Sequence, residues 1–124
     1  MPAFSFKKQF VAPIQAGTKR HTIRGERKDG RVPAKVGDNI SLFCGMRTKG
    51  CFRILPGTVL CTKVQPIQIY DGCLGLHRIM VDGTELDIGE SECLAKADGF
   101  NGWRDMARFW DGRLPFKGFI IHWR

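Results

Sequence analysis

The sequence has no long uninterrupted apolar run and no pair of cysteines in the Cys-x2-Cys spacing. The first absence excludes a membrane-spanning helix, which needs about 20 consecutive apolar residues. The first ten residues contain lysines but no long apolar stretch followed by small residues, so they do not predict a secretory signal. We therefore expect a cytoplasmic protein without a membrane partner.

The missing Cys-x2-Cys pair also argues against a structural zinc site, because metal knuckles usually have that spacing. The sequence has an odd number of cysteines, and we expect them to be reduced thiols that mostly fill apolar space. They are Cys44, Cys51, Cys61, Cys73 and Cys93. Neither a metal nor an organic cofactor is predicted.

Acidic residues are scarce relative to basic ones, with 12 Asp and Glu against 20 Lys and Arg, for a formal charge of +8. Such an excess favours polyanions or ligands that carry phosphate. The cations are concentrated between residues 19 and 35, and the segment 24–35 has almost no apolar residue and predicts an exposed loop. We expect Arg27, Lys28 and Arg31 in this loop to contact phosphates.

At 124 residues the chain fits one domain, residues 1–124, and it shows no repeat or linker. Helices are predicted from Phe10 to Gly17, from after Gly89 to Gly99 with Glu90 or Ser91 as the cap, and over 102–110. Strands are predicted over 21–24, 39–43, 58–69, 79–81, 84–88 and 116–123, with an Asp-Gly turn at 82–83. Pro66 indicates a bulge or an edge in the longest strand. This pattern predicts an α+β fold, a small barrel of about five to seven strands flanked by two or three short helices.

The segment from Gly17 to Arg24 places a lysine amine, a threonine hydroxyl and a guanidinium close together. If 21–24 is a strand, Thr22 and Arg24 share one face, and Lys19 lies on the turn that enters it. An amine beside a hydroxyl can activate a weak nucleophile. A simpler interpretation is that these residues are surface cations that protect a strand edge.

The pattern Phe10-x3-Ile14-x2-Gly17-x-Lys19-x2-Thr22-Ile23-Arg24 resembles the N-terminal signature of ASCH domains, which belong to the PUA-like barrel superfamily. Weaker likenesses follow in the expected order at 37–40, 95–100 and 119–123. The resemblance implies a small β-barrel with a cleft beside the glycine-lysine turn, used on RNA or nucleotide-like ligands. It is especially close to small bacterial amidohydrolases that remove acyl groups from N4-acetylcytidine and related nucleosides.

These amidohydrolases use a lysine, a threonine nucleophile and a helix carboxylate, which the resemblance transfers to Lys19, Thr22 and Asp98. Glu90 and Glu92 remain alternatives for the carboxylate, because the family members carry glutamate there. In this scheme Thr22 attacks the acyl carbonyl, Lys19 moves the proton, and Asp98 orients Lys19.

Other residues near these three are candidates for substrate binding. Nearby arginines, Arg20 and Arg24 among them, would lower the pKa of Lys19, and Arg24 could also polarise the oxyanion. A pyrimidine binds well between flat rings, which makes Tyr70, Phe100 and Trp103 candidates. We interpret His21, His77 and His122 as structural.

The leading hypothesis is hydrolysis of the amide of an N4-acylated cytidine. The alternatives are an RNA-binding module without amidohydrolase activity, or a ribonuclease that uses the same basic cleft. The hydroxyl of Thr22 favours the enzyme, because phosphate binding alone does not need it. The charge of +8 favours RNA, because a neutral nucleoside does not need so many cations. We expect a monomer or a weak dimer.

Overall fold

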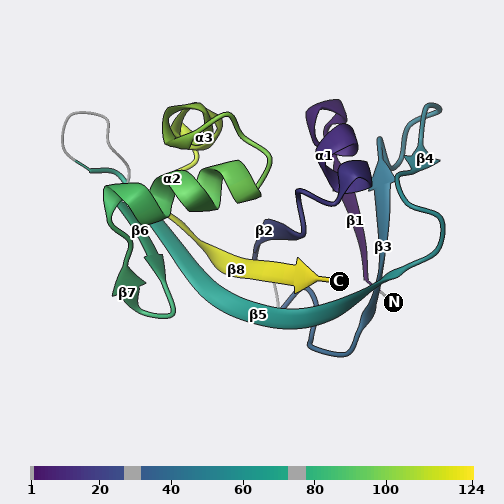
Figure 1. The fold of residues 1–124 in the computed structure, drawn as a ribbon, viewed down its shortest axis with the longest axis horizontal. Helices are drawn as coiled ribbons and strands as arrows, with labels where there is room; N and C mark the ends of the chain where they lie inside the picture. The colour runs from purple at the N-terminus through teal and green to yellow at the C-terminus, as the bar shows by residue number, and fades with distance from the viewer. Residues whose placement is uncertain (1, 27–31, 73–77) are drawn as a thin grey trace.

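The computed structural model describes residues 2–26, 32–72 and 78–124 and shows a mixed α+β fold (Figure 1). Three short helices accompany the strands, and a 3-10 turn, η1 (Lys8–Phe10), leads into the first of them. The helices are α1 (Val11–Ala16), α2 (Ile88–Ala97) and α3 (Trp103–Trp110). The strands are β1 (Ala3–Phe6), β2 (His21–Gly25), β3 (Asn39–Cys44), β4 (Phe52–Arg53), β5 (Val59–Tyr70), β6 (Arg78–Val81), β7 (Thr84–Glu85) and β8 (Phe116–Trp123).

The sheet is organised around β5, the long curved strand in Figure 1. β5 pairs with β3 near its start, with β8 along most of its length and with β6 at its end. A main path therefore runs β2-β8-β5-β3-β1, with β1 parallel to β3 and the other ladders antiparallel. Within the described residues no ladder joins β1 to β2, so the sheet is open there and closure into a barrel stays a prediction.

The core lies where the curved sheet and the helices pack together, and β8 is covered on both faces, because neighbouring strand side chains point to opposite faces and both Ile120 and Ile121 are buried. Ile67 and Ile69 of β5 are buried, and so are Ile120 and Ile121 of β8. Met106 contributes from α3. Burial of these large side chains drives formation of the sheet and fixes its register.

Two of the predicted helices have the expected boundaries. Gly17 ends α1 in a left-handed conformation, with φ of 80°, and α3 begins at Trp103. The predicted start of α2 was wrong, because the helix begins at Ile88 and not after Gly89. Asp87 is its N-cap, and its carboxylate accepts from the backbone N–H of Glu90, whose side chain accepts in return. This capping box satisfies two backbone donors at the start of the helix.

The predicted Asp-Gly hairpin is present between β6 and β7. Asp82 and Gly83 both have positive φ, 54° and 79°, as the two central residues of a type I′ turn require. In β5 the register shifts between Cys61 and Lys63 and not at Pro66, whose carbonyl accepts from Asp82 on the side of β6.

Several sequence expectations fall outside the described residues: those for Arg27, Lys28, Arg31, Cys73 and His77. The four cysteines in the described part are free thiols, of which Cys44 and Cys61 are buried. In that same part of the chain, no helix is long and apolar enough to cross a bilayer.

Candidate functional site

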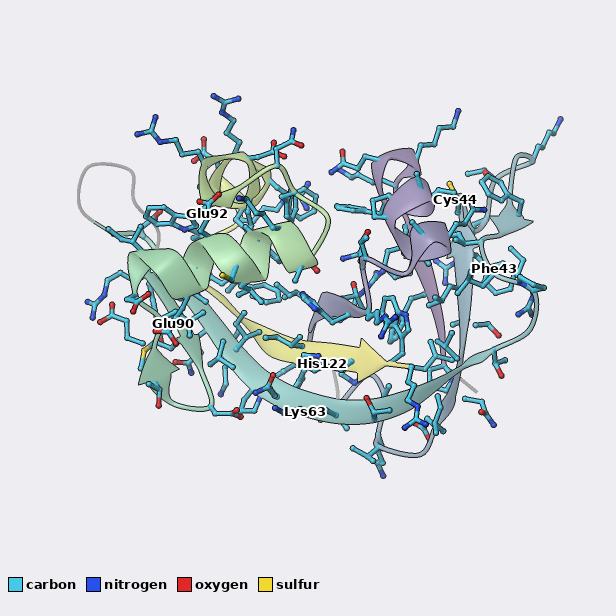
Figure 2. The ribbon with its side chains drawn as sticks, in the orientation of Figure 1. Phe43, Cys44, Lys63, Glu90, Glu92 and His122 are labelled. Atoms are coloured by element: carbon cyan, nitrogen blue, oxygen red, sulfur yellow. The ribbon has the colours of Figure 1, made fainter. Side chains whose placement is uncertain are left out.

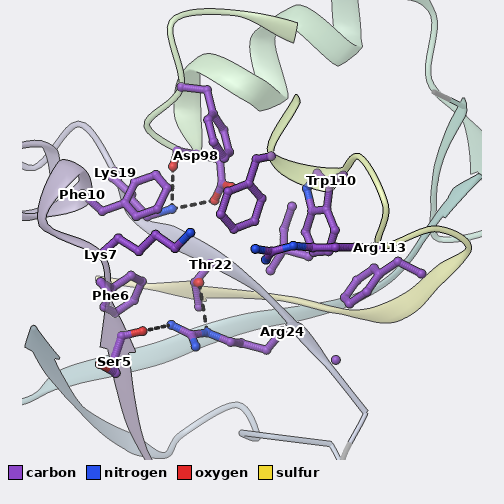
Figure 3. Close-up of a pocket in the computed structure, with 15 residues that line it drawn as sticks. Ser5, Phe6, Lys7, Phe10, Lys19, Thr22, Arg24, Asp98, Trp110 and Arg113 are labelled. Carbon is purple, nitrogen blue, oxygen red and sulfur yellow. Dashed lines mark hydrogen bonds and ion pairs between the residues drawn. The ribbon is translucent and has the colours of Figure 1, made fainter. Parts of the chain in front are cut away.

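A cavity of about 370 Å³ opens where β1 and β2 face the segments that follow α2 and α3 (Figure 3). It lies at the open side of the sheet, where no ladder joins β1 to β2 in the described residues. Its volume is at the lower end of the range for small-molecule sites, roughly 300–1,000 Å³. It is lined by Ser5, Phe6, Lys7, Phe10, Lys19, Thr22, Ile23, Arg24, Gly25, Asp98, Phe100, Phe109, Trp110, Arg113 and Phe116.

Lys19 reaches this cavity from the turn that joins α1 to β2. The turn is held because the backbone N–H groups of Thr18 and Lys19 both donate to the carbonyl of Pro13. The Lys19 side chain is only 2% exposed, and its Nζ donates to the backbone carbonyl and to Oδ1 of Asp98, each at 2.6 Å. Burial lowers the pKa of Lys19, the Asp98 carboxylate opposes this effect, and the Arg24 guanidinium adds to it.

Asp98 lies at the C-terminal end of α2, and the residue after it explains how the lysine comes so close. Gly99 has φ of 99°, a region that favours glycine. A Cβ on Gly99 would lie 2.9 Å from the Phe10 ring and 3.3 Å from Cδ of Lys19. The chain therefore needs a residue without a side chain here to hold Asp98 against Lys19.

The two alternative carboxylates do not line this cavity, although both lie on α2 (Figure 2). Glu90 belongs to the capping box at the start of the helix, and Glu92 accepts from the backbone N–H of Trp103. Of the three carboxylates considered, only Asp98 contacts Lys19.

His21 also approaches Asp98, which the sequence analysis missed. Its Nε2 lies 3.2 Å from Oδ1 of Asp98 but is not aligned for a hydrogen bond. It does not line the cavity, in agreement with its position on the face of β2 opposite Thr22. Its ring lies 5.3 Å from the ring of His122 on β8. His21 therefore lies beside the carboxylate without bonding it, and residue spacing alone could not show this.

Thr22 and Arg24 share a face of β2, as predicted, and both line the cavity. The Thr22 hydroxyl accepts from Nε of Arg24 at 3.3 Å, and Nη2 of Arg24 donates to the Ser5 carbonyl of β1 at 2.7 Å. In the described part of the chain Lys19 and Thr22 make no hydrogen bond to each other, although they line the same cavity. The turn thus does not bring the amine and the hydroxyl into hydrogen-bond contact.

Three of the predicted substrate-binding residues lie elsewhere, which corrects the sequence analysis. The exposed Arg20 turns back, and its Nε donates to the Gly17 carbonyl at 2.9 Å. Tyr70, at the far end of β5, donates to the Gln68 side chain. Trp103 lines a separate cavity beside α3. Strand and helix positions alone could not place these side chains relative to the cavity.

Phe100 does line the cavity and belongs to an aromatic wall that the sequence did not reveal. The rings of Phe10 and Phe109 each lie 5.4 Å from the Phe100 ring, the first of them edge-on. Trp110 and Phe116, with ring centroids 4.4 Å apart, extend the wall. These residues come from η1, from the segment after α2, from α3 and from β8, so only the tertiary fold brings them together.

Two exposed cations at the cavity were also missed. Nζ of Lys7 lies 4.9 Å from the centroid of the Phe109 ring, and Cζ of Arg113 lies 4.5 Å from the same centroid. Figure 3 shows both side chains turned toward the cavity, from opposite sides. With Lys19 and Arg24 they give the cavity four cations, whereas Asp98 is the single carboxylate among its described lining residues.

Comparison with known proteins gives no match to a family model, to a curated protein or to a solved structure. Among the described residues, no group of three His, Cys, Asp or Glu side chains is placed to hold a metal ion.

Proposed function

We propose that this chain is an ASCH-type protein with a PUA-like fold that hydrolyses the amide of N4-acylated cytidines. The observation that supports this function is the meeting of Lys19, Thr22 and Asp98 in one cavity, since these are the three residues that the resemblance requires. The curved path from β2 to β1 agrees with a barrel whose opening lies between those two strands. A protein with this activity would act in the cytoplasm.

The proposed reaction begins when Oγ1 of Thr22 attacks the acyl carbonyl and its proton passes to neutral Lys19. The tetrahedral intermediate then collapses, and the bond from carbon to N4 breaks. Lys19 returns the proton to the departing N4, which gives cytidine and an acyl ester on Thr22. Water hydrolyses that ester, with Lys19 taking a proton from the water and giving one to Thr22.

The surroundings of Lys19 support its role as the base. A lysine must lose its proton to accept another, and burial lowers the pKa of Lys19 in that direction. The short bonds to Asp98 hold the amine in place and favour its charged form, which opposes the effect of burial. With the two effects opposed, Lys19 can both accept and release a proton. Because no hydrogen bond joins Lys19 to Thr22 in the described residues, substrate binding or a bridging water must complete the path.

Arg24 and the aromatic wall have roles in this proposal as well. The Arg24 guanidinium already donates to the Thr22 oxygen and lies within 4.8 Å of the Phe6 centroid, so it can stabilise negative charge that develops beside Thr22. The aromatic wall, with Phe100 among its rings, offers apolar contacts for a pyrimidine.

The test is incubation of the purified protein with N4-acetylcytidine while cytidine and acetate are measured. Thr22→Ala should abolish product formation, whereas Thr22→Ser should retain part of it because the hydroxyl survives. Thr84→Ala, in the exposed hairpin, is the matched control and should act like the wild type. Normal turnover by Thr22→Ala would remove Thr22 as the nucleophile.

The second candidate is RNA binding without hydrolysis, and the formal charge of +8 favours it. It predicts a gel shift with short RNAs that weakens as salt rises, together with no release of acetate from N4-acetylcytidine. Cleavage of the RNA in the same experiment would instead point to a ribonuclease.

A further inference from the structure

Lys7 and Arg113 have no role in the chemistry proposed above, yet both are turned toward the cavity. Neither makes an ion pair with a carboxylate in the described part of the chain, and both lie over the same ring, that of Phe109. Like charges repel each other, so an anion bound between two cations that contact one ring would lower their electrostatic energy. Nothing in the amide chemistry of a neutral nucleoside supplies that anion.

The charge of the whole cavity leads to the same conclusion. When Lys19 is neutral, as a general base must be, Lys7, Arg24 and Arg113 remain as three cations against the single carboxylate of Asp98. Two positive charges are then uncompensated. A phosphomonoester carries about −1.5 to −2 at pH 7 and has three strong acceptor oxygens.

The position of the two residues also separates them from the reacting groups. Lys19 and Asp98 are buried, whereas Lys7 and Arg113 are exposed at the mouth. Lys7 follows β1 directly, and Arg113 follows α3, where its backbone N–H donates to the Trp110 carbonyl. A ligand whose base reaches the buried amine would thus place its sugar side toward these cations.

We infer that the substrate is an acylated cytidine nucleotide and that Lys7 and Arg113 bind its phosphate. This inference rests on the proposed function for the identity of the base, whereas the phosphate site rests on the positions of Lys7 and Arg113 and on the excess of cations in the cavity. A lone nucleotide is favoured over a long RNA because the cavity has a volume of only about 370 Å³.

The test is a calorimetric comparison of cytidine, cytidine 5′-monophosphate and cytidine 3′-monophosphate as ligands of the whole protein. One of the monophosphates should bind at least about tenfold more tightly than cytidine, since charge-assisted hydrogen bonds contribute that much. The double variant Lys7→Ala with Arg113→Ala should lose this advantage and bind cytidine unchanged. The control, Lys8→Ala with Arg108→Ala, removes the same charge from residues that do not line the cavity and should keep the advantage.

Equal affinity for cytidine and both monophosphates would overturn the inference, and so would equal losses in the test and control variants. A short RNA that binds more tightly than both monophosphates, with the excess also lost in the Lys7 and Arg113 variant, would overturn the choice of a lone nucleotide. Binding needs no hydrolysis, so absence of amidohydrolase activity would contradict the proposed function and leave the phosphate site standing. Conversely, hydrolysis of N4-acetylcytidine without any preference for phosphate would contradict this inference alone.

Discussion

The Lys19 ammonium has both of its hydrogen bonds to one residue, Asp98, and is almost fully buried. A substitution at this position can show whether the positive charge of Lys19 or its ability to lose a proton matters. Arginine keeps the charge but remains protonated at every accessible pH. If Lys19 is a fixed cation, the arginine variant should be active. If Lys19 is a general base, that variant should be inactive.

For Lys19→Arg we expect hydrolysis of N4-acetylcytidine to fall by about 10²–10⁴-fold, nearly as far as for Lys19→Ala. Steady-state kinetics measure the fall, and circular dichroism checks that each variant folds. If Lys19→Arg is fully active, Lys19 is a contact for an oxyanion or a phosphate and not the base.

The wild-type rate gives an independent check that needs no variant. Burial lowers the pKa of Lys19 from its ordinary 10.5, so kcat/KM should rise with pH through an ionisation below that value. A rate that is flat with pH across this range would argue against a lysine base.

Some of the site could be predicted from residue spacing, and some could not. Lys19, Thr22 and Arg24 follow one another along a turn and a strand, so their presence around one cavity was predictable from local geometry. Asp98 came only through the family resemblance, which left Glu90 and Glu92 open. Lys7 was invisible to sequence reasoning, because nothing local indicates that β1 ends beside the segment after α3.

At the scale of elements, α2 is the helix whose end carries Asp98, and its start is fixed by the capping box of Asp87 and Glu90. The predicted caps, Glu90 and Ser91, come too late in the sequence, because Gly89 resembles a break before the helix. The boundaries of α3 and β8 were predictable, since a dense apolar pattern marks each of them. The register shift of β5 between Cys61 and Lys63 was not, because no turn residue marks it.

For Asp87→Ala we expect a loss of about 0.5–2 kcal/mol in the free energy of unfolding. The substitution removes the capping carboxylate, so a backbone donor at the start of α2 loses its partner. Urea denaturation followed by circular dichroism measures it. Asp71→Ala, which removes an exposed carboxylate outside the helices, is the control and should change stability by less than about 0.5 kcal/mol. Equal losses for the two variants would mean that the cap contributes nothing.

At the scale of the whole molecule, His122 connects stability to pH, because it lies on β8 between β2 and β5 (Figure 2). Burial, with smaller contributions from His21 and Lys63, lowers its pKa to about 4, and the Asp82 carboxylate opposes this effect. The unfolded chain therefore takes up a proton near pH 6.5, before the folded chain does. This contribution to stability is complete above about pH 6.5 and is lost as the pH falls toward 4.

We expect the wild-type Tm to fall between pH 6.5 and 4, and we expect His122→Gln to show a smaller fall. Glutamine does not titrate, and it can still donate a hydrogen bond to Gln65, the partner of His122. Calorimetry at several pH values measures both proteins, and the carboxylates titrate in each, so they cancel in the comparison. Identical pH dependence would mean that His122 has no part in the loss.

The pairing of β2 has a consequence for how the molecule folds. In the described residues its only ladder is to β8, from His21 with His122 to Gly25 with Gly118, so the partners come from nearly opposite ends of the printed sequence. Such distant pairing raises the relative contact order. The entropy cost of closing the long loop must be met before the contacts between the strands can form. During synthesis β2, with Thr22 and Arg24 on it, therefore stays an unpaired edge until β8 has been made. Assembly of the cavity is thus a late event in the life of each chain, and a nascent chain that stalls before β8 lacks it.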